Sequence, residues 1–224
     1  MRDFLIGNGP LVVGVLLLIE AAVLVCLLKE HKRAKAPLVL CMALVTAGLL
    51  FDGAVILLGR FLPEGLLKAL SMGRYLFHGL CMPLLLMISV YALGLKGTAL
   101  KVFWGVAALL MALGAVAGLM TKLNVVDFAG FLRCTGSDAT PKWADSYLST
   151  LSVAMVIPLI LVGIWLMIKR KGPFLFLSGL FMFAFSALGP ATGNIDLIFL
   201  IGMIGEALMV LFFLLHAKKA AKKA

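Results

Sequence analysis

The chain has 224 residues, of which 63% are hydrophobic and 13% are charged, and its mean hydropathy is +1.16. Soluble domains are about half apolar and about a quarter charged, so this composition excludes an ordinary soluble protein and indicates lipid as the solvent. The net charge of +10 does not call for nucleic acid, and we expect no such partner, because the basic residues flank apolar blocks as membrane insertion requires.

The apolar blocks have the length that crosses about 30 Å of hydrocarbon, and they predict seven transmembrane helices. In chain order these cover residues 9–28, 37–60, 70–94, 100–121, 146–168, 173–190 and 195–216. The first block is too long for a signal-peptide core and lacks a small-residue cleavage pattern, so we expect it to stay as a helix. We therefore predict an all-α integral membrane protein, with residues 1–224 forming a single seven-helix membrane domain.

Basic residues are distributed unevenly among the loops. They gather after the first, fifth and last blocks, as Lys29, Lys32, Arg33 and Lys35, then Lys169, Arg170 and Lys171, then Lys218, Lys219, Lys222 and Lys223. Because cytoplasmic loops carry the excess of lysine and arginine, this pattern predicts an outside N-terminus and a cytoplasmic C-terminus. The expected location is the plasma or inner membrane, as a multi-pass protein whose first partner is the lipid bilayer.

The segment 122–145 is the one long loop, and it lies on the predicted outer face. It mixes apolar residues with turn formers, which leaves two interpretations: a membrane-surface hairpin or lid, or a loop packed over the end of the bundle. Just before it, Gly114 and Gly118 form a small-xxx-small pair that favours close helix packing. Three of the four cysteines lie in apolar blocks and Cys134 lies in this loop, so no structural disulfide is expected.

Ionisable side chains inside the apolar blocks are the candidate functional residues. Five such residues occur, namely Glu20, Asp52, Arg74, His78 and Glu206. Each costs at least about 2.5–3.5 kcal/mol at the centre of a lipid-spanning helix, so we expect them to face the bundle interior and find partners. Asn194 and Asp196 are expected at the outer mouth of the last helix.

The depths of these residues follow from the rise of about 1.5 Å per residue in a helix. Asp52 and His78 come from successive helices at similar depths, and we expect them to form an outer pair. Arg74 lies one turn above His78 on the same face. Glu20 and Glu206 lie near the midplane on the first and last helices, which are neighbours in a ring, so their carboxyl groups are expected to approach each other.

These positions predict one polar cluster shared by helices 1, 2, 3 and 7 and open toward the outside. In the favoured hypothesis it binds or transports a small ligand or a proton, with Arg74 gating or orienting and the two glutamates holding a midplane proton. One alternative is an intramembrane lipid hydrolase in which Asp52 and Glu206 act on water as acid and base. Another is a non-catalytic scaffold or partner subunit, in which buried ion pairs only fix packing. We favour a non-enzymatic role, and oligomers are possible.

Several other classes of site are not supported by the sequence. A seven-helix zinc hydrolase needs several histidines at one depth, and His78 is the only histidine within an apolar core, so no metal site is expected. A bis-histidine haem site is not supported either, because it needs a second histidine within the membrane. No phosphate-binding glycine loop is present either, and we expect no cofactor.

Two segments resemble the microbial (type 1) rhodopsin-like superfamily. In "RYLFHGLCMPLLL" an Arg-Tyr pair opens the outer end of the third helix and Pro83 follows nine residues after Arg74, while "GNIDLIF" is similar to that family's Asn-Ile-acid entry to the last helix. The resemblance implies seven helices, the same orientation, and Arg74 as an outer gate or pairing residue. That family's retinal-binding lysine is replaced by Leu208, its counter-ion by Phe77 and the acid of its last helix by Ile204, so retinal photochemistry is not implied.

Overall fold

The computed structural model describes residues 7–128, 130–191, 193 and 195–221, without the side chains of residues 128, 189, 190, 195–197 and 221. Its helices are α2 (Gly9–Ala34), α3 (Pro37–Leu58), the 3₁₀ turn η1 (Gly59–Phe61), α4 (Glu64–Cys81), α5 (Pro83–Leu93), α6 (Gly97–Met120), α7 (Lys142–Ile168), α8 (Phe174–Ala191) and α9 (Ile195–Ala221). Two strands, β1 (Leu123–Phe128) and β2 (Phe131–Gly136), connect α6 to α7.

The helices are suited to a lipid bilayer. Six of them are long and apolar enough to cross a membrane, counting α4 and α5 as one, and the apolar stretch 174–188 of α8 is shorter. Their outer faces carry apolar side chains that no other described residue covers, with Leu18 73%, Leu109 61% and Leu161 62% exposed. Such surface is unfavourable in water and favourable against acyl chains. The prediction of an all-α, multi-pass membrane bundle is therefore confirmed.

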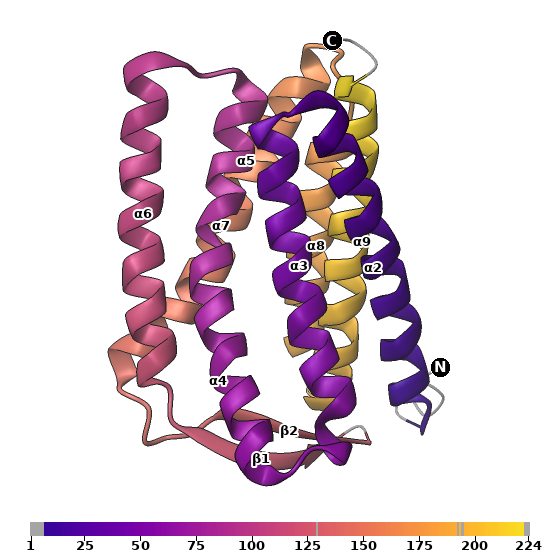
Figure 1. The fold of residues 1–224 in the computed structure, drawn as a ribbon, viewed down its shortest axis with the longest axis vertical. Helices are drawn as coiled ribbons and strands as arrows, with labels where there is room; N and C mark the ends of the chain where they lie inside the picture. Colours follow the sequence, from indigo (N-terminus) through magenta and orange to yellow (C-terminus); the bar gives the residue numbers. More distant parts are fainter. Residues whose placement is uncertain (1–6, 129, 192, 194, 222–224) are drawn as a thin grey trace.

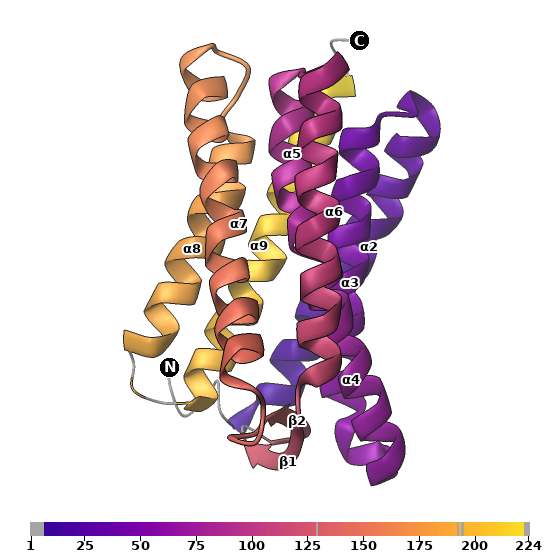
Figure 2. The ribbon, with the colours of Figure 1, turned by 90° about the vertical axis from the view of Figure 1, so that its left-hand side faces the viewer.

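The helices form a closed ring. Each contacts its neighbour in sequence, α9 packs on α2 to complete the circle, and α3 also contacts α9. Figures 1 and 2 show the helices running nearly parallel to one long axis. The expected adjacency of the first and last helices is confirmed. We name the end that carries the two strands the hairpin end, and the opposite end, where the C-terminus lies, the basic end (Figure 1).

Proline and left-handed residues set several helix ends. α3 begins at Pro37 and α8 directly after Pro173, as predicted, because the first turn of a helix needs no N–H donor there. Lys35 caps the C-terminal end of α2 and Gly94 that of α5, both with positive φ. Pro83 removes one backbone donor inside the third span, which divides that span into α4 and α5.

Glycines allow α4 and α6 to cross in backbone contact. A Cβ atom on Gly79 would overlap the Gly114 backbone, and one on Gly118 would lie 2.8 Å from the Tyr75 carbonyl oxygen. The expectation that Gly114 and Gly118 serve close packing is confirmed. This close crossing with α6 fixes the position of α4, and with it the positions of Arg74 and His78.

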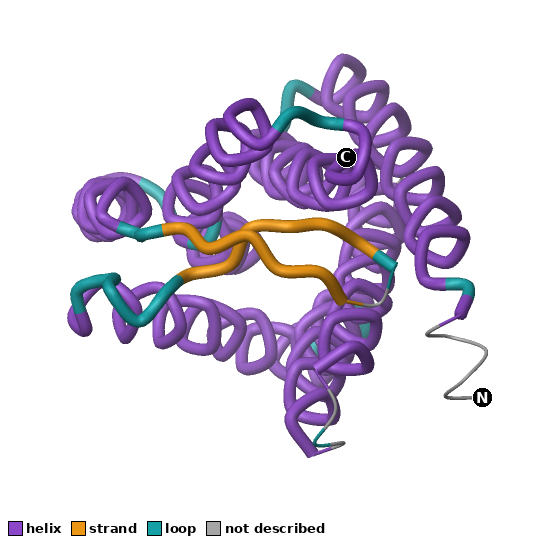
Figure 3. Tube along the Cα trace, turned by 90° about the horizontal axis from the view of Figure 1, so that it is seen from below, coloured by secondary structure: helices purple, strands orange, loops and turns teal. Residues whose placement is uncertain are grey.

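The segment between α6 and α7 is an antiparallel hairpin that lies across the end of the bundle, as seen from below in Figure 3. Arg60 of η1 holds it by two hydrogen bonds to Asp127, of 2.7 and 2.8 Å, and one of 2.8 Å to the Gly130 carbonyl. Gly59 touches the Leu132 carbonyl so closely that no side chain fits there. Both sequence interpretations thus apply, because the loop is a hairpin and is packed over the bundle.

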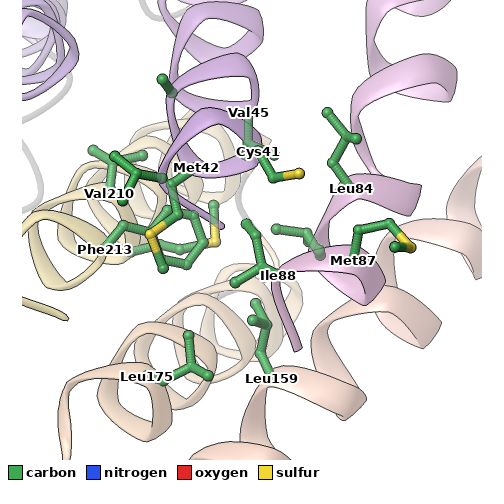
Figure 4. Close-up of a cluster of buried hydrophobic side chains, with 14 of the residues drawn as sticks. Cys41, Met42, Val45, Leu84, Met87, Ile88, Leu159, Leu175, Val210 and Phe213 are labelled. Carbon is green, nitrogen blue, oxygen red and sulfur yellow. The ribbon is translucent and has the colours of Figure 1, made fainter. Parts of the chain in front are cut away.

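Apolar side chains fill the basic half of the bundle. Figure 4 shows residues of α3, α5, α7, α8 and α9 converging on one cluster, among them Met42, Ile88 and Phe213, which are each 0% exposed. Three of the ionisable residues predicted within the helices, Asp52, Arg74 and Glu206, lie toward the hairpin half instead, around one cavity. The candidate site described below is therefore at the hairpin end.

Candidate functional site

A cavity of about 530 Å³ lies between α3, α4, α7 and α9, below β2 of the hairpin. Apolar and aromatic side chains make much of its wall. Its acidic, basic and histidine lining residues are Asp52, Arg74, His78, Arg133, Asp145 and Glu206. Four of the five ionisable residues predicted within the helices therefore line one cavity, and Glu20 does not.

Arg74 and Asp52 form a forked ion pair on the cavity wall. Arg74 Nε is 2.6 Å from Asp52 Oδ1 and Nη2 is 3.3 Å from Oδ2, while Nη1 donates to the Cys134 carbonyl of the hairpin at 3.4 Å. Arg74 is 7% exposed and Asp52 33% exposed. Asp52 therefore pairs with Arg74, and the predicted Asp52–His78 pair is wrong. The long guanidinium stem reaches along the helix, and its fork matches the carboxylate better than an imidazole does.

His78 bonds to α7 instead. Its Nε2 lies 2.7 Å from the Ser152 hydroxyl, and Ser152 Oγ is also 2.9 Å from the Leu148 carbonyl oxygen. The serine proton therefore has two acceptors within reach, the carbonyl oxygen and the ring nitrogen. Ser152 was visible in the sequence only as a mildly polar residue, because nothing in the chain order indicates which helix faces His78.

Glu206 reaches the cavity from α9. Its carboxyl makes no hydrogen bond and no ion pair with the residues that the structure describes, although it lies within electrostatic range of Asp52, Glu20, Arg74 and Arg133. It is partly exposed, and that exposure is to the cavity it lines. Glu206 is therefore available to a ligand or to water, as is Asp145, an exposed acid near the start of α7 that also lines the cavity.

Glu20 is fully buried outside the cavity lining. It is 0% exposed, and neither carboxyl oxygen has a hydrogen-bond partner among the described residues. The predicted approach of Glu20 and Glu206 does not produce a hydrogen bond. One turn before each glutamate, Leu17 and Met203 meet over Gly53, which makes this three-helix contact apolar.

Arg133 is a site residue that the sequence analysis did not identify. It projects from β2, its guanidinium carbon is 5.0 Å from the centre of the Phe199 ring, and Phe131 packs on the same ring at 5.5 Å. Burial, reinforced by the neighbouring charge of Arg74, lowers the pKa of Arg133 to about 10. At neutral pH it remains a cation. The position of Arg133 in a long loop did not indicate a role in the site, because only the strand register places this residue over the cavity.

The remaining predicted positions lie at the start of α9. Asn194 is outside the residues that the structure describes, and the side chain of Asp196 is too, although its backbone belongs to α9. Within the described part of the chain, no three histidine, cysteine or acidic side chains gather as they would around a metal ion.

Comparison with known proteins adds no family. The sequence matches no family model and has no significant match among curated proteins. A function must therefore be argued from the cavity and its side chains.

Proposed function

We propose that this protein is a seven-span membrane protein that binds a small ligand, or exchanges a proton, in the cavity beneath the hairpin. The observation that carries the proposal is a single cavity that joins Asp52 to Glu206 and extends to β2. Its volume of about 530 Å³ lies within the usual range of small-molecule sites, which are largely apolar with a few polar groups.

We also propose the hairpin end as the outer end, since the lysine-rich connections lie at the opposite one.

The charges of the cavity define the ligand chemistry. Arg74 and Asp52 neutralise each other, and Arg133 lies over Phe199, so these groups shape the wall and roof. Glu206 has no such partner among the described residues. We expect the ligand to present a cationic or hydrogen-bond-donating group to Glu206 and an apolar body to the rest of the lining. Where a proton is the ligand, the Glu206 carboxylate accepts it from hydronium, which is left as a neutral water in the cavity.

The packed basic half favours a binding role in this conformation. The apolar cluster of Figure 4 separates the cavity from the basic end. Transport therefore needs a second conformation in which that cluster opens, whereas binding needs only the present one.

The test compares two glutamates that differ in their access to the cavity. Proton flux is measured in proteoliposomes and ligand binding by thermal shift, for Glu206→Gln and for the matched control Glu20→Gln. The proposal predicts loss of flux or binding in Glu206→Gln alone. Equal behaviour of the two variants, with stability as the only change, would favour the scaffold hypothesis instead.

The resemblance to rhodopsin-like proteins remains a proposal about architecture. Of the three replaced positions, Phe77 lines the cavity and packs on Phe51 at 5.2 Å, whereas Leu208 and Ile204 are not among the lining residues. A ligand held here would contact an aromatic side chain where that family has its counter-ion. We propose that the bundle serves a ligand other than retinal.

A second candidate, an intramembrane hydrolase, is favoured by the contact between His78 and Ser152. Asp52 is engaged by Arg74, so the expected acid and base pair of Asp52 and Glu206 has lost one member. A serine with a histidine nitrogen at 2.7 Å is instead the arrangement that activates a hydroxyl for acyl transfer, and both side chains line the cavity.

The hydrolase candidate is tested by labelling with a fluorophosphonate, which reacts with activated serines. Ser152→Ala should abolish labelling, and Ser149→Ala, one turn away on the same cavity wall, should not. Absence of labelling in the wild type would remove the hydrolase candidate and leave ligand binding.

A further inference from the structure

A second cavity, of about 320 Å³, lies at the basic end, where α3, α5 and α9 meet the end of α7 and the connection that follows it. Its cationic lining comes from Lys171, after α7, and Lys219, near the end of α9, with His216 one turn before Lys219. Leu38 and Leu166 give it an apolar side. This cavity is distinct from the ligand cavity described above, because the apolar core lies between them.

The two lysines are held by aromatic rings and not by acids. Lys171 Nζ is 5.5 Å from the centre of the Trp165 ring, and Lys219 Nζ is 5.8 Å from that of Phe174. Neither ammonium group has a carboxylate within 4 Å in the part of the chain that the structure describes. Two cations that share a cavity without a carboxylate partner make its lining positive and favour an anion from outside the chain.

The connection after α7 is shaped to receive Lys219. Gly172 has a φ of 125°, and a Cβ atom on it would lie 2.7 Å from Lys219 Nζ. A side chain at this position would therefore displace the ammonium group from the space next to the connection. The absence of a side chain at Gly172 leaves room for the Lys219 ammonium group beside the connection.

The position of the cavity along the bundle indicates the kind of anion. It lies among the basic connections, and one of its lining residues, Tyr91, accepts a hydrogen bond of 2.9 Å from the Trp104 indole. Paired aromatic residues with polar tips are typical of the boundary between acyl chains and headgroups. A phosphate at this level would meet the lysines, and the glycerol and first acyl carbons would face the apolar side made by Leu38 and Leu166.

We propose that this cavity binds the phosphate group of an anionic phospholipid. Basic pockets between transmembrane helices at the lysine-rich side of a membrane bind such headgroups. The ligand chemistry is a phosphate with net negative charge, and its source is the surrounding bilayer. The proposal is independent of what the hairpin-end cavity binds.

The test uses pairs of lysine substitutions with equal change in net charge. Lys171→Gln/Lys219→Gln removes the cavity cations, and Lys169→Gln/Lys218→Gln removes exposed neighbours that do not line it. Purified protein in neutral detergent is titrated with phosphatidylglycerol, with phosphatidylcholine as the neutral lipid, and bound lipid is counted by native mass spectrometry. The apparent Kd for phosphatidylglycerol should rise about tenfold or more in the cavity variant and less than about threefold in the control.

Further arms separate the outcomes. In one arm, the thermal stability of the protein is measured with increasing inorganic phosphate. If phosphate stabilises the wild type but not the cavity variant, the phosphate chemistry is supported, and free phosphate is then a second source of the anion. Lys171→Arg/Lys219→Arg keeps the charges and should retain lipid, which guards against a folding defect in the glutamine variant. Equal losses in the cavity and control variants, or equal binding of the two lipids by the wild type, would overturn the proposal.

Discussion

Replacing Asp52 by Asn should reveal how strongly the cavity wall depends on the ion pair with Arg74. The substitution keeps the shape of the side chain and leaves Arg74, which is 7% exposed, without its carboxylate. Removing one member of a fully buried pair costs about 3–5 kcal/mol. Asp52 is 33% exposed to the cavity, and solvent there screens part of this energy. We therefore expect the free energy of unfolding to fall by about 2–3 kcal/mol.

The assay is a double-mutant cycle measured by denaturant unfolding in mixed micelles. The cycle comprises Asp52→Asn, Arg74→Gln and the double variant, which should lose at least about 1 kcal/mol less than the sum of the single losses. Glu64 and Lys68, an exposed pair also on α4 and with an N–O distance of 2.5 Å, supply the control cycle and should show little coupling. Additive losses for Asp52 and Arg74 would refute the reasoning that they act as one unit.

Three further predictions concern packing and the roof of the cavity. Gly79→Ala should lower the free energy of unfolding by about 1–3 kcal/mol, because the added methyl group meets the α6 backbone. Gly105→Ala, with open space around it, is the control, and equal losses in the two variants would contradict the close crossing of α4 and α6. Glu20→Leu should raise the unfolding free energy by about 1–3 kcal/mol, since it removes a carboxyl that has no hydrogen bond to the described residues, and a decrease would show that the carboxyl is stabilising. Gly59→Ala should loosen the hairpin and speed its cleavage in limited proteolysis from the hairpin side, and unchanged cleavage would mean that Arg60 holds the hairpin alone.

The spans could be predicted closely from the sequence because each depends on local apolar length. The predicted block 37–60 corresponds to α3 with η1, and 100–121 to α6 within a few residues. The third span begins earlier than predicted, at Glu64, since an exposed amphipathic turn precedes its apolar part. Hydropathy alone does not identify such a turn as helical.

The site could be predicted by residue but not by partner. Asp52, Arg74, His78 and Glu206 were identified because ionisable groups in lipid-spanning helices rarely lie anywhere but the interior. Their pairing depends on helix rotation and side-chain reach, which depth estimates do not contain.

Arg133 and Ser152 were missed for a related reason. One lies in a hairpin and the other on α7, and each joins the site only through contacts between segments distant in the chain. His78 and Ser152, for instance, are 74 residues apart in sequence.

The ion pair between Asp52 and Arg74 also has a consequence for biogenesis. The two residues are 22 positions apart on consecutive helices joined by a short turn, so α3 and α4 can leave the translocon as a preassembled hairpin whose opposite charges cancel. Glu206 belongs to α9, which is synthesised after the other described helices and enters when its neighbours are already in place. A ribosome-bound chain ending before α9 would therefore hold the pair of Asp52 and Arg74 but lack Glu206.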